Sequence, residues 1–243
     1  MPILDNILLK KAQGKKSLAV LIDPDKHQQT DLRFITSCNQ LNIDYFFIGG
    51  SFVHKVDLEK TIRFVKQHTD IPLIIFPGDA DHIDSSADAF LLLSMISGRN
   101  PELLIGKHVQ AAQALKESRL EVIPTGYMLI DGGKLTNVSY ISQTTPIPSG
   151  NTEIAVSTAL AGEMLGLKLM YMDAGSGANS TVPPMMVKRV SSAIKLPLII
   201  GGGIRTPDSM QELFSAGADI IVVGNALEEN PEMLWEIAMA REI

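Results

Sequence analysis

The chain alternates between short aliphatic runs and longer segments in which apolar residues recur at helical spacing. Eight aliphatic runs, bounded by Gly, Pro or polar residues, predict buried parallel strands. They are residues 18–24, 45–51, 73–78, 89–95, 121–130, 167–174, 197–203 and 219–225. Helical spacing predicts helices between most of them, at residues 30–40, 58–68, 101–118, 153–165, 184–193, 207–216 and 231–241. This alternation indicates a parallel α/β fold.

Eight such units favour closure into a (βα)8 TIM barrel over an open sheet. The 243 residues of the chain are near the ~250 residues of one barrel, so residues 1–243 are predicted to form a single barrel domain. One connection departs from the pattern, because residues 78–88 are too short and too polar for a packed crossover helix. Helix 3 of the barrel is therefore predicted to be missing or reduced. The longest loop, residues 131–150, is typical of a lid or an interface element.

Glycine-rich segments end the last two predicted strands. Gly201, Gly202 and Gly203 follow one aliphatic run, and Gly224 and Asn225 follow the next. Backbone N–H groups at such strand ends bind anions, and the loops after strands 7 and 8 commonly form the phosphate site of a TIM barrel. The sequence therefore predicts a phosphorylated small-molecule ligand.

Polar side chains at the ends of the first two predicted strands suggest a metal site. Asp23 and Asp25 follow strand 1, and Ser51 follows Gly49 and Gly50 at the end of strand 2. Mg²⁺ is usually bound by one or two carboxylates together with water and substrate phosphate, which these residues would allow. Two simpler interpretations stay open: the aspartates cap the following helix, and the glycines and serine form an ordinary turn.

Strand 6 ends in small residues that follow a carboxylate, Asp173. Held at the barrel mouth, that carboxylate could accept a proton from a substrate hydroxyl as a general base; alternatively, it satisfies loop backbone as a turn residue. The five histidines show no metal-ligand spacing and are interpreted as surface or loop residues. They are His27, His54, His68, His82 and His108. No nucleophile motif and no dinucleotide fingerprint is present.

Net charge and cysteine content indicate which binding partners and which cellular compartment the protein has. A net charge of −6 gives no basic footprint for nucleic acid. The single cysteine, Cys38, excludes an internal disulfide framework and favours a reducing compartment. No apolar run reaches the ~18 residues of a membrane span, and the N-terminus lacks the pattern of a signal peptide. We therefore expect a cytoplasmic protein without nucleic-acid partners, one that contacts a membrane surface only through a lipid-like substrate.

Several segments, taken in order, resemble the geranylgeranylglyceryl phosphate synthase family, and most closely its second group from archaea and some bacteria. The resemblance covers residues 17–231. Its motifs are residues 21–25 (LIDPD), 47–51 (FIGGS), 124–127 (PTGY), 171–177 (YMDAGSG), 201–205 (GGGIR) and 224–225 (GN). The last two alone occur in many phosphate-binding barrels, whereas the ordered combination is specific. The missing third helix also fits this family.

The resemblance implies transfer of a prenyl group from a prenyl diphosphate, such as geranylgeranyl diphosphate, to the 3-hydroxyl of sn-glycerol 1-phosphate. It assigns Mg²⁺ to Asp23 and Ser51, and the catalytic base to Asp173. The residues implied to bind glycerol phosphate are Tyr171, Met172, Asp173, Ala174, Gly175, Ser176, Gly177, Gly202, Gly203, Gly224 and Asn225. The family more often has glutamate where this chain has Asp173, so the resemblance leaves the efficiency of the base open.

The prenyl tail is expected to lie along alternate residues of 90–95 and the apolar residues of 101–105, on the side left open by the missing helix. The default interpretation of these residues is ordinary barrel and helix core. In the family, bulk at one helix position limits tail length; here Leu103 or Leu104 occupies that helix, which contains no tryptophan, and a C20 chain or a longer one would fit. Family members form dimers and hexamers, so a homo-oligomer is expected. Tyr140 in the long loop is a candidate contact, or simply an exposed loop tyrosine.

Two alternatives remain. One is another phosphate-binding barrel enzyme, an isomerase or aldolase, which would require a catalytic lysine in a strand or a paired acid and base; the only strand lysine is Lys168, near the bottom of strand 6. The other is a non-catalytic protein that binds a phosphorylated ligand and in which Asp173 is not a base.

Overall fold

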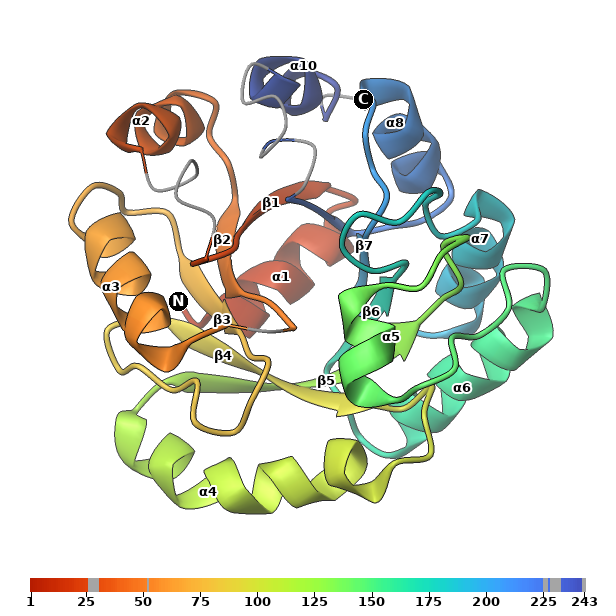
Figure 1. The fold of residues 1–243 in the computed structure, drawn as a ribbon. Helices are drawn as coiled ribbons and strands as arrows, with labels where there is room; N and C mark the ends of the chain where they lie inside the picture. Colours follow the sequence, from red (N-terminus) through yellow and green to blue (C-terminus); the bar gives the residue numbers. More distant parts are fainter. Residues whose placement is uncertain (26–30, 52, 225–226, 228–232, 242–243) are drawn as a thin grey trace.

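The computed structural model describes residues 1–25, 31–51, 53–224, 227 and 233–241. Its centre is a closed barrel of eight parallel strands in sequential order (Figure 1). The strands are β1 Ser17–Ile22, β2 Tyr45–Gly49, β3 Leu73–Phe76, β4 Ala89–Met95, β5 Glu121–Leu129, β6 Leu169–Asp173, β7 Leu198–Gly201 and β8 Ile220–Val223. Each overlaps its predicted range, and the register of β1 against β8 closes the sheet. The predicted TIM barrel is therefore confirmed.

Helices surround the strands. Those predicted from apolar spacing are α2 Leu32–Gln40, α3 Lys55–Lys66, α4 Lys107–Ser118, α6 Thr152–Met164, α7 Pro184–Ala193, α8 Pro207–Ser215 and α10 Met233–Met239. A π-helical turn, η2 Glu102–Gly106, precedes α4. The structure describes every residue of 77–88 and none of them is helical, which confirms the missing helix between β3 and β4. None of the helices in the described ranges is long and apolar enough to cross a bilayer.

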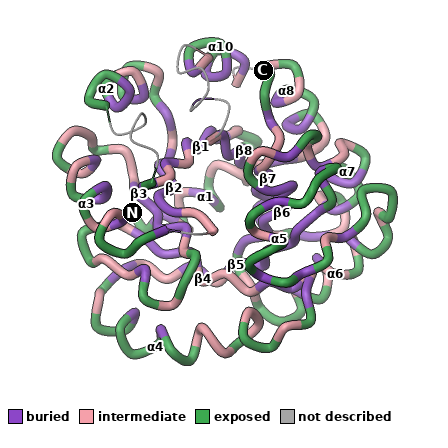
Figure 2. The backbone as a smooth tube through the Cα atoms, viewed as in Figure 1, coloured by how far each residue is buried: buried purple, intermediate pink, exposed green. Residues whose placement is uncertain are grey.

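The strands separate two hydrophobic layers, because successive side chains of a strand face opposite sides. In β2, Tyr45 and Phe47 face the interior of the barrel, whereas Phe46 and Ile48 face the surrounding helices. Most strand residues of both layers are buried and purple in Figure 2, with intermediate, pink stretches in β4 and β5. The alternation decides which residue of each strand end reaches the barrel mouth.

Helices α1 and α5, both within the described residues, were not predicted from the sequence. Helix α1, Ile3–Ala12, lies behind the strands in Figure 1 and closes the N-terminal end of the barrel. Its Ile3 and Ile7 pack with the interior layer, and its first backbone N–H groups donate to the Glu121 carboxylate. Helix α5, Asn137–Ser142, lies in the long loop in front of the barrel. With one end closed by α1, the interior opens at the C-terminal ends of the strands.

Candidate active site at the mouth of the barrel

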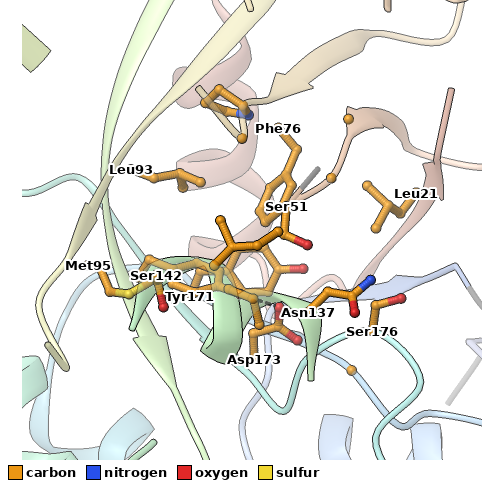
Figure 3. A pocket seen from close by; sticks show the side chains of 18 of the residues that line it. Leu21, Ser51, Phe76, Leu93, Met95, Asn137, Ser142, Tyr171, Asp173 and Ser176 are labelled. Carbon is orange, nitrogen blue, oxygen red and sulfur yellow. Dashed lines mark hydrogen bonds between the residues drawn. The ribbon is translucent and has the colours of Figure 1, made fainter. Parts of the chain in front are cut away.

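A cavity of about 440 Å³ occupies the C-terminal mouth of the barrel (Figure 3). Among the residues that line it are nine of the predicted site residues: Asp23, Ser51, Tyr171, Asp173, Ser176, Gly177, Gly202, Gly203 and Gly224. They come from the ends of five strands, namely β1, β2, β6, β7 and β8. The fold thus brings the proposed metal ligands, the proposed base and the glycine cradle to one cavity.

Three members of the predicted 171–177 segment lie elsewhere. Met172 and Ala174 do not line the cavity, because strand alternation turns their side chains into the outer hydrophobic layer. Gly175 supports the site through its backbone instead, since its N–H donates to Oδ1 of Asp173 at 2.7 Å. Asn225 lies outside the described residues.

Asp173 is a buried carboxylate at the end of β6, with only 8% of its surface exposed. Its Oδ1 accepts from the Gly175 backbone, and its Oδ2 accepts from the hydroxyl of Tyr127. Burial raises the pKa of Asp173 because it disfavours the charged form, while the two hydrogen bonds oppose that rise. A carboxylate oriented and tuned in this way suits proton transfer from a hydroxyl.

Tyr127 is a functional candidate that received no role from the sequence, although it ends the 124–127 motif. Burial and the neighbouring Asp173 raise the pKa of Tyr127 well above its usual value, so the hydroxyl keeps its proton and donates. Its ring packs with Phe76 and Tyr171 at centroid distances of 6.0 and 5.4 Å. The register of the two strands places Tyr127 near Asp173, because Tyr127 on β5 pairs with Tyr171 on β6, two residues before Asp173. The three rings form the floor of the cavity.

The glycine cradle depends on backbone conformations that other residues rarely adopt. Gly202 has φ +80°, and a Cβ there would lie 2.5 Å from Oδ1 of Asp173 and 2.6 Å from the Gly175 nitrogen. Gly203 has φ +69°, and a Cβ there would lie 2.4 Å from the carbonyl oxygen of Ser180. Arg205, exposed at the edge of the cavity, adds a positive charge. Such a cradle can surround a phosphate group with backbone N–H donors.

Across the mouth, Asp23 and Ser51 supply oxygen atoms. Oδ2 of Asp23 lies 3.8 Å from where a Cβ on Gly50 would stand, so the carboxylate borders the end of β2. Oδ1 of Asp23 also accepts from the Asp25 backbone at 3.1 Å, which supports the turn interpretation beside the metal one. Asp25 is exposed and does not line the cavity.

These donors fit Mg²⁺ only as part of a shared coordination sphere. Among the residues that the structure describes, no three His, Cys, Asp or Glu side chains form a complete metal site. A carboxylate and a hydroxyl are hard oxygen donors, and Mg²⁺ typically completes its octahedron with water and substrate phosphate. Asp23 and Ser51 therefore suit a metal ion that binds together with a diphosphate.

The cavity extends from the barrel interior to the outer face of β4. Phe90, Leu92, Leu93, Met95 and Leu103 line it, all from the two predicted segments, although the residues of β4 come from both faces of the strand and not from alternate positions alone. Leu104 instead packs against the outer hydrophobic layer. This part of the cavity is open because the helix that would follow β3 and pack beside β4 is missing. At its edge Lys107 of α4 donates to Asp79 of the β3–β4 loop at 2.7 Å.

Helix α5 forms one wall of the cavity with Asn137, Val138, Ile141 and Ser142, and Figure 3 shows Asn137 beside Ser176. The sequence predicted that this loop is a lid or an interface element, but not which of its residues line the site. A capping box between Thr136 and Ser139 is the local signal that starts this short helix.

A parallel barrel with a glycine cradle on one side of its mouth and a carboxylate–hydroxyl pair on the other defines a TIM-barrel protein for phosphorylated ligands. The chain belongs to the PcrB family, whose sequence model matches residues 11–241. It is 51% identical to the geranylgeranylglyceryl phosphate synthase of Chitinophaga pinensis, over 98% of this chain and 95% of that one. Identity to the synthase of the same name from Pyrococcus abyssi is 40%, over 88% and 85% of the two chains.

A solved structure of a geranylgeranylglyceryl phosphate synthase has the same fold. The fold matches (S)-3-O-geranylgeranylglyceryl phosphate synthase of Thermoplasma acidophilum, in complex with its substrate sn-glycerol 1-phosphate, with a TM-score of 0.93. The two chains are 33% identical and each is covered completely. The family predicted from the ordered motifs is thereby confirmed.

Proposed function

We propose that this protein is a prenyltransferase that joins geranylgeranyl diphosphate to the 3-hydroxyl of sn-glycerol 1-phosphate. The observation that carries the proposal is a single cavity that holds a buried carboxylate, a glycine cradle and an apolar extension, each suited to one part of the two substrates. The relative from Chitinophaga pinensis, 51% identical to this chain, bears the name of this activity.

In the proposed reaction, the hydroxyl oxygen of the acceptor forms a bond to the allylic carbon of the donor. The bond between that carbon and the diphosphate oxygen breaks, and the diphosphate leaves with its electron pair. The hydroxyl proton passes to the carboxylate of Asp173. The cradle of Gly202 and Gly203 holds the acceptor phosphate, so that its hydroxyl is fixed relative to the base.

Asp23 and Ser51 would hold Mg²⁺, which supplies positive charge to the departing diphosphate. The neutral Tyr127 keeps the Asp173 carboxylate in place through its hydrogen bond. Leu93, Leu103 and their apolar neighbours exclude water from the donor tail. The alternative isomerase or aldolase is less well supported, because Lys168 precedes β6 at the closed end of the barrel and does not line the cavity.

The direct test is to incubate the protein with Mg²⁺, sn-glycerol 1-phosphate and prenyl diphosphates of C15 to C35, and to identify products by mass spectrometry. We expect a prenyl ether of glycerol phosphate with the highest yield at C20 or longer, and one diphosphate released per product. Glycerol phosphate binding without any ether would instead favour the non-catalytic binding protein. Conversion of a phosphorylated substrate without a prenyl donor would favour an isomerase or aldolase.

Replacing Asp23 with asparagine should raise the Mg²⁺ concentration needed for half-maximal activity at least about 10-fold, because even indirect ligand changes cost 10- to 100-fold in metal affinity. Affinity for sn-glycerol 1-phosphate, measured by calorimetry without metal, should stay unchanged. Asp25→Asn is the matched control, since Asp25 is exposed and lies outside the cavity. Equal Mg²⁺ requirements in both variants would remove Asp23 from the metal site.

Further features stay predictions: magnesium as the particular metal, a cytoplasmic location, a single domain over residues 1–243, and a dimer or hexamer. Tyr140, exposed on α5, is consistent with either of its two interpretations.

A further inference from the structure

His82 is a buried imidazole in the segment that replaces the missing helix. Only 4% of its surface is exposed, although the segment around it is polar. The sequence predicted that the histidines lie on the surface or in loops. His82 does lie in a loop, but its side chain is buried there. The proposed reaction gives His82 no part.

The ring of His82 holds the backbone of the same segment. Its Nδ1 accepts a hydrogen bond from the Gly78 N–H at 3.2 Å. With Nδ1 as acceptor, the proton of the neutral ring is on Nε2, which lies 3.9 Å from a carboxylate oxygen of Asp81. The His82 backbone N–H donates to the carbonyl of Asp79 at 3.3 Å. The segment from Gly78 to His82 is thus a closed turn with the imidazole at its centre.

Gly78 in turn lies directly against the end of β2. A Cβ at Gly78 would lie 2.3 Å from the carbonyl oxygen of Gly50 and 3.3 Å from the carbonyl carbon of Ser51. Gly50, Ser51 and Gly78 all line the cavity, on the side of Asp23. A displacement of Gly78 therefore has to displace Gly50 and Ser51, or open a gap beside them.

We propose that His82 is a positioning residue for the donor diphosphate: through the bond from Gly78 to its Nδ1, it fixes the end of β2 that presents Ser51. The proposal depends on the proposed function in naming a diphosphate as the ligand. His82 acts indirectly, because it does not line the cavity itself and is linked to the lining only through Gly78. Sites for multivalent anions depend on such placement, since a shift of about 1 Å weakens several interactions together.

The test compares two substitutions that differ in one property. His82→Asn keeps a hydrogen-bond acceptor at the position of Nδ1, whereas His82→Leu removes it at similar bulk. The probe is inorganic diphosphate with Mg²⁺, titrated by calorimetry, and the reference ligand is sn-glycerol 1-phosphate. We expect the leucine variant to bind diphosphate about 3- to 10-fold more weakly, as the loss of one hydrogen bond predicts. We expect the asparagine variant to remain within about twofold of the wild type.

Both variants should bind sn-glycerol 1-phosphate as the wild type does, since its cradle lies across the mouth. In turnover assays the leucine variant should show a raised KM for the prenyl diphosphate and an unchanged KM for the acceptor. His68→Asn is the control, because His68 also bonds to the backbone but at Phe64 of α3, outside the cavity lining.

Three results would overturn the proposal: a leucine variant with wild-type diphosphate affinity, an asparagine variant as weak as the leucine variant, or an equal loss of both ligands. Where the leucine variant does not fold, an asparagine variant that binds diphosphate more weakly than the expected twofold limit relative to the wild type overturns the proposal by itself. If the wild type formed no prenyl ether, the proposed function would fail, while diphosphate affinity would still decide the role of His82.

Discussion

Replacing Asp173 with asparagine is expected to lower turnover by about 10²- to 10⁴-fold, the usual contribution of a general base. Affinity for sn-glycerol 1-phosphate should change little, because asparagine still offers an oxygen to the Gly175 N–H that now donates to Oδ1. Single-turnover kinetics with saturating donor and acceptor measure the chemical step. Met172→Leu is the matched control on the same strand, since Met172 faces the outer layer and the change nearly conserves volume.

The pH dependence gives an independent reading of the same residue. The base must be ionised, and burial raises the pKa of Asp173, so the rate should fall with acid at a pH above the ~3.9 of an ordinary aspartate. The asparagine variant should lose this acid limb from its residual rate. Unchanged turnover, or an acid limb that persists in the variant, would exclude Asp173 as the base.

The Asp173→Asn variant should lose activity without losing thermal stability. A carboxyl whose pKa is raised in the folded state favours folding more as the pH falls through that pKa, and opposes it at neutral pH. Asparagine carries no such charge, so the Tm of the variant at pH 7 should equal or exceed that of the wild type. A large loss of Tm would contradict this expectation and would indicate that the carboxylate itself stabilises the folded barrel.

Gly202→Ala is expected to weaken sn-glycerol 1-phosphate binding by about 100-fold or more, a loss of the size that a 1 Å misplacement causes. The added Cβ would lie 2.5 Å from Oδ1 of Asp173, so the variant should lose turnover as well as affinity. The φ of +80° adds strain of about 1–2 kcal/mol for any residue with a Cβ. Calorimetric titration of the acceptor measures the effect.

Gly150→Ala is the control for this glycine, because nothing lies within 4 Å of its Cβ position. It should leave affinity and Tm within experimental scatter of the wild type. Tight acceptor binding by Gly202→Ala would show that the phosphate does not lie in the cradle of Gly202 and Gly203. Other polar residues of the mouth would then have to bind it.

The parts of the fold that could be predicted from sequence are those with a strong local pattern. Aliphatic runs identified the eight strands of the barrel. Functional residues of parallel barrels lie at the C-terminal ends of the strands, and this rule alone predicted that Asp23, Asp173 and Gly202 share one site. The missing helix could also be predicted, because the segment of residues 78–88 is too short and too polar to form a packed crossover helix.

The parts that could not be predicted depend on register and on distant contacts. Tyr127 became visible as the partner of Asp173 only when β5 and β6 were aligned. Met172 and Ala174 appeared equivalent to their neighbours in a linear motif, yet strand alternation sends them to the opposite layer. Helix α5 spans only Asn137–Ser142, too short for apolar spacing to reveal. The burial of His82 follows from the folding of a polar loop on itself.

The absent helix beside β4 also affects the energetics of the whole chain. In most of the barrel a helix covers the outward side chains of a strand, but here Leu92 stays partly exposed and lines the cavity. A prenyl tail bound there would cover this apolar surface, as a helix does elsewhere. Ligands that bind only the folded state raise the free energy of unfolding in proportion to the logarithm of their concentration. The supply of prenyl diphosphate in a cell would then set how stable this barrel is, as well as how fast it works.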